Sequence, residues 1–145
     1  MHKLATLITC AILACANAAA ADPVRHEKVV LTPHAPVQQL SGKIKGNATV
    51  EYSLVVPAGA VLDLRLKGAN RSNYFNVFAE GADEALFVGS RDGDHFHATA
   101  TGGGAYKVQV YLMRNAARRN ETASYVLEAG IDAGKHEGKG VAGKP

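Results

Sequence analysis

Apolar and polar residues alternate with period two in several short segments of this chain. The clearest run extends from Val50 to Val56, and similar alternation occurs over residues 62–67, 106–112 and 125–131. Such alternation is typical of antiparallel strands that bury one face and expose the other. Turn-forming residues separate the runs at 46–47, 57–59, 68–70, 92–94 and 102–104. We therefore predict an all-β fold, a single antiparallel β-sandwich of about eight strands.

Three segments depart from this alternation and set the expected boundaries of the domain. Residues 22–36 are rich in proline and are expected to form an extended lead-in, with a strand at 28–31. Residues 114–120 place helix-favouring residues between two asparagines, which predicts a short helical turn before the last strand. Residues 133–145 lack apolar periodicity and are expected to be a flexible tail. The sandwich is thus predicted to span residues 37–132.

The first 21 residues have the features of a secretory signal peptide. Lys3 gives a basic start, residues 4–14 are apolar, and residues 16–21 are small enough for a cleavage site. The apolar run is too short to span a bilayer, so we expect a removable signal and no stable membrane association. The protein is therefore expected to be exported.

Both cysteines, Cys10 and Cys15, fall inside this predicted signal. The domain that remains after cleavage is therefore expected to contain no disulfide. An alternative stays open, because residues 12–15 loosely resemble a lipoprotein cleavage box in which Cys15 would become lipidated.

The charge balance argues against a nucleic-acid partner. The chain has 16 Lys and Arg against 13 Asp and Glu, and loss of Lys3 with the signal leaves 15 against 13, or +2. A balance this even excludes strong overall basicity, so any functional charge must be local.

The sequence contains no recognisable catalytic set. The glycine run 102–104 lacks the partners of a phosphate-binding loop, and no serine has a nucleophile-elbow context. His95 and His97 would share one strand face near Asp92 and Asp94, and could hold a metal ion. Because no distant further ligand is indicated, we prefer exposed strand histidines beside a turn. We therefore predict neither an enzyme nor a cofactor.

Arg114 and Arg118 are the strongest candidate binding residues. They are four positions apart and would lie on one face of a helical turn. Two guanidinium groups on one face form a strong donor pair for carboxylates. The alternative is that these arginines are solvated or pair with Glu121 or Glu128 within the domain.

Residues 105–110, 114–122 and 125–127, with an opening segment at 40–46, together resemble a known family. They are similar to the periplasmic inhibitors of g-type (goose-type) lysozyme. The resemblance covers residues 40–131 and is strongest at 114–119. It implies an exported β-sandwich in the periplasm that binds g-type lysozyme and occludes its acidic cleft.

The resemblance also implies partner-binding residues. By position, Gly104 and Tyr106 match a glycine–tyrosine loop of the family, and Arg114 and Arg118 match its arginines. Arg119 lies beside them and is included as a candidate contact.

Gly103 is a departure from the family, which has serine at this position. The glycine removes a hydroxyl and makes the loop more costly to order on binding. An alternative function therefore stays open: a non-inhibitory envelope module that binds cell-wall glycan or another periplasmic protein. The oligomeric state is also open.

Overall fold

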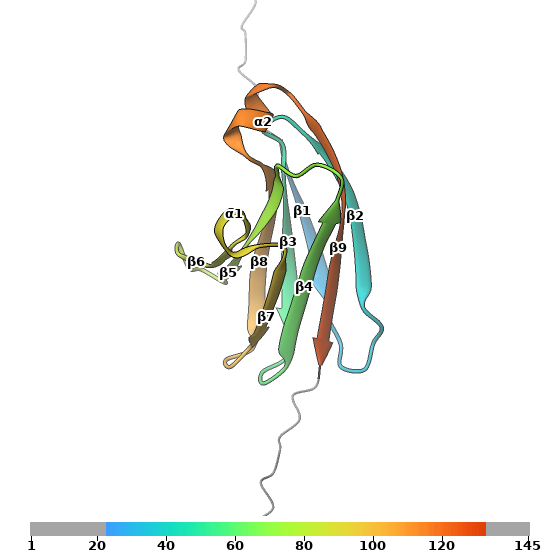
Figure 1. Ribbon diagram of the computed structural model, residues 1–145. Coiled ribbons are helices and arrows are strands. Elements are labelled where there is room, and N and C mark those ends of the chain that lie inside the picture. Colours follow the sequence, from blue (N-terminus) through green and yellow to red (C-terminus); the bar gives the residue numbers. More distant parts are fainter. Residues whose placement is uncertain (1–22, 133–145) are drawn as a thin grey trace, which may run out of the picture.

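Nine strands in two facing sheets make up residues 23–132, the part of the chain that the computed structural model describes (Figure 1). The strands are β1 (Val24–Val30), β2 (Gln38–Lys45), β3 (Thr49–Val56), β4 (Val61–Gly68), β5 (Asn73–Ala79), β6 (Ala85–Val88), β7 (His95–Thr99), β8 (Gly104–Leu112) and β9 (Thr122–Asp132). Two helical turns, α1 (Gly89–Asp92) and α2 (Arg114–Arg118), connect them. Neither turn is long enough to cross a membrane.

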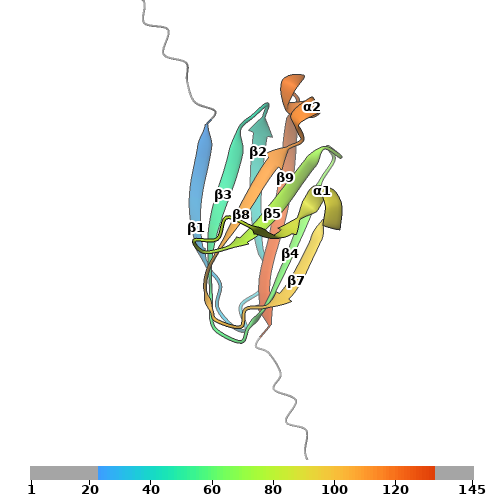
Figure 2. The ribbon, with the colours of Figure 1, turned by 90° about the vertical axis from the view of Figure 1, so that its left-hand side faces the viewer.

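The five-stranded sheet has the order β1-β3-β8-β5-β6, and the four-stranded sheet has the order β2-β9-β4-β7. In the second sheet, β9 lies between β2 and β4 and pairs antiparallel with both. Figure 2 shows the first sheet in front, with α2 at one end and the β3–β4 and β7–β8 turns at the other. Strand β8 therefore connects the two ends of the sandwich.

The core lies between the two sheets and is made from the alternating apolar residues. In β3 the buried positions are Val50, Tyr52, Leu54 and Val56, and β9 buries every second residue from 123 to 131. Burial of these side chains on both sheets provides the main driving force for folding. The period-two pattern thus reports which face of each strand turns inward.

A tyrosine pair joins the two sheets inside this core. The Tyr52 and Tyr125 hydroxyl oxygens are 2.8 Å apart, and the two residues are 0 % and 3 % exposed. Burial and this hydrogen bond raise the pKa of Tyr125 well above its ordinary value. Tyr125 lies directly opposite Gly42 of β2 in the strand register, and its ring covers that glycine. The aromatic ring therefore occupies the space that a side chain at position 42 would need.

The structure confirms an all-β sandwich and a helical turn at 114–118, with nine strands rather than about eight. One pairing differs from the predicted antiparallel arrangement, because β1 runs parallel to β3. The reason is topological. The chain passes from β1 to β2 in the opposite sheet and then to β3 in the first sheet. Because it reverses direction at each step, β3 runs in the same direction as β1.

Two further details differ from the expectations. The strand within residues 22–36 begins at Val24 rather than at position 28. The predicted turn at 92–94 begins within α1, where the Asp92 carboxylate accepts a hydrogen bond from the Val88 backbone N–H at 2.9 Å. The predicted signal peptide, with Cys10 and Cys15, and the predicted tail lie outside the described residues.

Candidate functional site

The helical turn α2 is fastened to the sandwich on both sides. Ala116 and Ala117 are buried, so one face of the turn packs on the core. At its start, the Met113 N–H donates to the Ser72 carbonyl at 2.9 Å, and after its end the Gly46 N–H donates to the Glu121 carbonyl at 2.9 Å. These contacts hold the turn in place, so the side chains on its outer face are presented by a rigid support.

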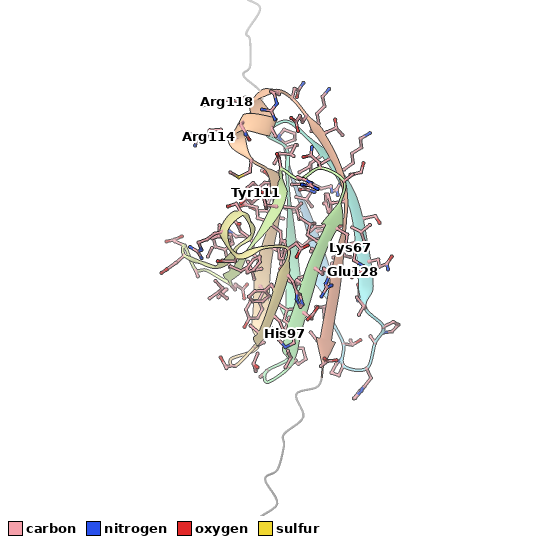
Figure 3. The ribbon with its side chains drawn as sticks, in the orientation of Figure 1. Lys67, His97, Tyr111, Arg114, Arg118 and Glu128 are labelled. Carbon is pink, nitrogen blue, oxygen red and sulfur yellow. The ribbon has the colours of Figure 1, made fainter. Side chains whose placement is uncertain are left out.

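Arg114 and Arg118 are on that outer face. Both are exposed, and both lie at the α2 end of the molecule (Figure 3). Among residues 23–132, neither arginine has a carboxylate within ion-pair distance. The two guanidinium groups are thus available to an external acidic partner.

Arg119 has a different role from these two arginines. Its Nε donates to Glu121 Oε1 at 2.8 Å, while Asn70 Nδ2 donates to Glu121 Oε2 at 3.1 Å. The hydrogen bonds from Arg119 and Asn70 lower the pKa of Glu121. Internal pairing with Glu121, which the sequence left open for Arg114 and Arg118, is therefore made by Arg119 instead. Glu128, the other carboxylate considered as a partner for these arginines, instead pairs with Lys67, with 2.7 Å between Glu128 Oε1 and Lys67 Nζ.

Two further basic residues lie at the same end, and sequence reasoning missed them. Lys45 ends β2 opposite Thr122, and Arg71 lies in the turn between β4 and β5 next to Ser72. Both are exposed. No motif indicates them, because only the fold brings positions 45 and 71 near position 114. We call the end formed by α2, Lys45 and Arg71 the arginine end.

The Gly104–Tyr106 segment lies at the opposite end of β8. Gly104 begins this strand, and Arg114 begins α2 two positions after the strand ends at Leu112, so about 30 Å of extended chain separates them. The Tyr106 ring is partly buried and packs against the core. The structure therefore does not bring the glycine–tyrosine segment and the arginines into one site.

The geometry of Gly103 explains why serine is disfavoured here. Its φ is +64°, in the left-handed region that glycine adopts most easily. A Cβ at this position would lie 2.8 Å from the Ala58 backbone nitrogen, closer than real Cβ atoms approach. The β3–β4 turn thus occupies the space that a serine side chain at this position would need.

The substitution Gly103→Ser is expected to destabilise the protein by about 1–3 kcal/mol, because it adds backbone strain and a steric contact. Urea unfolding followed by circular dichroism measures this change. The control is Gly102→Ala, since a Cβ at position 102 meets nothing within 4 Å. Equal stability of the Gly103→Ser variant and the unmodified protein would contradict the prediction.

His95 and His97 share a strand face as predicted, and the structure adds a third residue. Asp63 Oδ2 lies 2.8 Å from His95 Nε2 and 2.8 Å from His97 Nδ1. Burial raises the pKa of Asp63, but the hydrogen bonds from His95 and His97 outweigh it, and the net pKa shift is downward. No local pattern indicates Asp63, because it lies on β4 and only the register with β7 brings it beside the histidines.

Comparison with known proteins identifies relatives only among solved structures; no family model and no curated protein matches the chain. The periplasmic inhibitor of g-type lysozyme from Aeromonas hydrophila, PliG, is 33% identical, with 77% of this chain and 100% of that chain covered and a TM-score of 0.68.

Two more distant structures share the fold. PliG from Salmonella Typhimurium is 21% identical, with 74% of this chain and 98% of that chain covered and a TM-score of 0.57. The pre-peptidase C-terminal domain of a Bacillus anthracis collagenase is 18% identical, with coverages of 76% and 99% and a TM-score of 0.54. The same sandwich thus occurs in proteins with different roles, so the fold alone does not define function.

Proposed function

Because this chain belongs to the family of periplasmic inhibitors of g-type lysozyme, we propose that it binds a g-type lysozyme and inhibits it without catalysing a reaction. The observation that carries this proposal is the 33% identity to the Aeromonas hydrophila inhibitor over all of that chain. Inhibition by binding requires no cofactor and no turnover.

The arginine end is the surface that we assign to the enzyme. A lysozyme cleft contains the carboxylates needed for cleavage of a glycosidic bond. Arg114 and Arg118 have no internal carboxylate partner among residues 23–132, so they are free to donate to such groups. Because the α2 backbone is held in place, binding costs little backbone entropy, and the entropic cost is confined to the arginine side chains. Lys45 and Arg71 add positive charge that accelerates encounter with an acidic cleft.

A contribution from Gly104 and Tyr106 stays a prediction. These residues lie at the far end of β8 from the arginines, so they would meet the enzyme through a second surface. The internal packing of Tyr106 would then have to change for its ring to act as an anchor. Arg119 is expected to act mainly by holding Glu121 in place.

The periplasm is the proposed location. Residues 1–21 have the pattern of a cleavable signal, and the Aeromonas hydrophila and Salmonella Typhimurium relatives are described as periplasmic. An inhibitor there would meet lysozyme that reaches the cell wall.

A cell-wall ligand is the alternative function. An open groove of about 500 Å³ lies on the outer face of the five-stranded sheet, and polar residues such as His26, Glu51 and Lys107 line it. Polar side chains of this kind can form hydrogen bonds with sugar hydroxyls. An envelope module would bind through this groove and would leave lysozymes unaffected.

Titration of the purified secreted protein against g-type, c-type and i-type lysozymes tests the proposal. In a cell-wall lysis assay, we expect g-type activity to fall to a low residual level near one inhibitor per enzyme, with c-type and i-type activity largely unchanged. Undiminished g-type activity at a large excess, together with retention on peptidoglycan, would contradict inhibition and favour the envelope module.

A further inference from the structure

Two neighbouring strands of the four-stranded sheet place two imidazoles and a carboxylate on its outer face. In the register of β4 and β7, Asp63 lies directly opposite His97, and Arg65 lies directly opposite His95. Because alternate residues of a strand point to the same side, Asp63, His95 and His97 project from one face. Figure 3 shows His97 beside β4 and β7, toward the end of the sandwich opposite α2.

The three side chains already converge. The ligand atoms Asp63 Oδ2, His95 Nε2 and His97 Nδ1 all lie within 4.8 Å of one another. Ligand atoms about 2.1 Å from a tetrahedral zinc ion lie about 3.4 Å apart. Asp63 Oδ2 is 2.8 Å from each histidine nitrogen, so a small outward movement of these side chains would make room for an ion.

The chemistry of these donors selects a class of ion. Imidazole nitrogen suits zinc, copper and nickel, and one carboxylate adds a negative charge to the set. Three protein ligands with a water in the fourth position are a common zinc arrangement. The ligating side chains are 39 %, 58 % and 42 % exposed for His95, His97 and Asp63, so solvent can supply that water.

We propose that Asp63, His95 and His97 form a binding site for a divalent transition-metal ion, with zinc as its simplest occupant. The site is separate from the arginine end and does not depend on lysozyme binding. The hydrogen bonds to Asp63 hold the two rings in place in the metal-free protein. Arg65 opposes the ion, because this positively charged residue is the partner of His95 in the strand register.

Metal binding at this site would link a strand that has one neighbour in the sheet to a strand that has two. Strand β7 has five residues and lies at the edge of its sheet, where it pairs with β4 alone. An ion held by Asp63 of β4 and both histidines of β7 would link the edge strand to its neighbour. Because the ion binds only the folded arrangement, it raises the stability of the fold.

Isothermal titration of zinc chloride into the untagged secreted protein tests the proposal. We expect one ion per chain, a rise in melting temperature, and shifts of the ring-nitrogen resonances of His95 and His97 in NMR spectra. His97→Ala and Asp63→Asn should each weaken zinc binding by roughly tenfold or more, since each removes a ligand or its charge. Arg65→Gln should tighten binding, because it removes the opposing charge.

His26 provides the matched control. Its Nδ1 lies 3.3 Å from Glu51 Oε2 on the other sheet, and among residues 23–132 this pair belongs to no group of three potential ligands. His26→Ala should leave zinc affinity and stoichiometry unchanged. Zinc binding that survives the double substitution His95→Ala and His97→Ala would overturn the assignment, as would the absence of any heat or melting shift with the unmodified protein. Circular dichroism verifies that each variant is folded.

Discussion

The double substitution Arg114→Ala and Arg118→Ala is expected to weaken inhibition of g-type lysozyme by at least about 100-fold while the protein stays folded. Each arginine is expected to form charge-assisted hydrogen bonds with cleft carboxylates, worth about 1.5–3 kcal/mol per residue. Since neither arginine has an internal carboxylate partner among residues 23–132, the substitutions remove no ion pair from that region. Residual lysozyme activity against inhibitor concentration gives the affinity, and circular dichroism reports the fold.

Arg119→Ala is the matched control for this result. It removes a guanidinium from the same end, but one that already pairs with Glu121. We expect a loss below tenfold. The charge-conserving variant with lysine at positions 114 and 118 should be intermediate, because lysine keeps the charge without the two-pronged geometry of arginine. Full inhibition by the double alanine variant would show that the arginine end is not the enzyme-binding surface.

Gly42→Ala is expected to lower the free energy of unfolding by about 2–4 kcal/mol, the largest stability effect that we predict. An added Cβ would lie 2.3 Å from the Tyr125 hydroxyl oxygen and 2.4 Å from its Cζ. The ring cannot move away freely, because it is buried and its hydroxyl is hydrogen-bonded to the Tyr52 hydroxyl. The methyl group would therefore displace Tyr125 and separate the tyrosine pair.

Urea unfolding measured by tyrosine fluorescence and circular dichroism determines this loss. Gly102→Ala again serves as the comparison, because it makes the same chemical change in open space and should shift stability by less than about 0.5 kcal/mol. Tyr125→Phe, which removes the hydroxyl alone, is expected to cost about 1 kcal/mol. Equal stabilities of the Gly42→Ala and Gly102→Ala variants would contradict the role given to the ring.

The alternation of side chains made most of the fold predictable. Val50 to Val56 bury every second residue as expected, since period two is a property of the strand itself and needs no knowledge of its neighbours. The parallel pairing of β1 was not predictable in this way. It depends on which sheet receives β2, and that choice is made by long-range packing. The turn α1 is too short to leave a periodic signal.

In the candidate sites too, a local sequence pattern reveals some residues, and only the fold reveals the others. Arg114 and Arg118 are four residues apart in the chain, so a local pattern was sufficient to place them on one face. Asp63 is more than thirty positions from His97, and only the β4–β7 register brings them together. The separation between Gly104 and the arginines, in contrast, follows from the length of β8 and was already present in the sequence.

The central place of β9 in its sheet determines when this protein can fold. The chain is synthesised from its N-terminus, and export through a signal peptide would follow the same order, yet the strand between β2 and β4 is the last of the nine described strands. Until residues 122–132 are available, β2 has no partner and β4 pairs only with β7, so both expose open edges. Pairing of such distant segments is slow, because loop closure must precede the contacts that compensate for it. Folding of the four-stranded sheet is therefore delayed until residues 122–132 are available, and a chain truncated before β9 would be prone to aggregate.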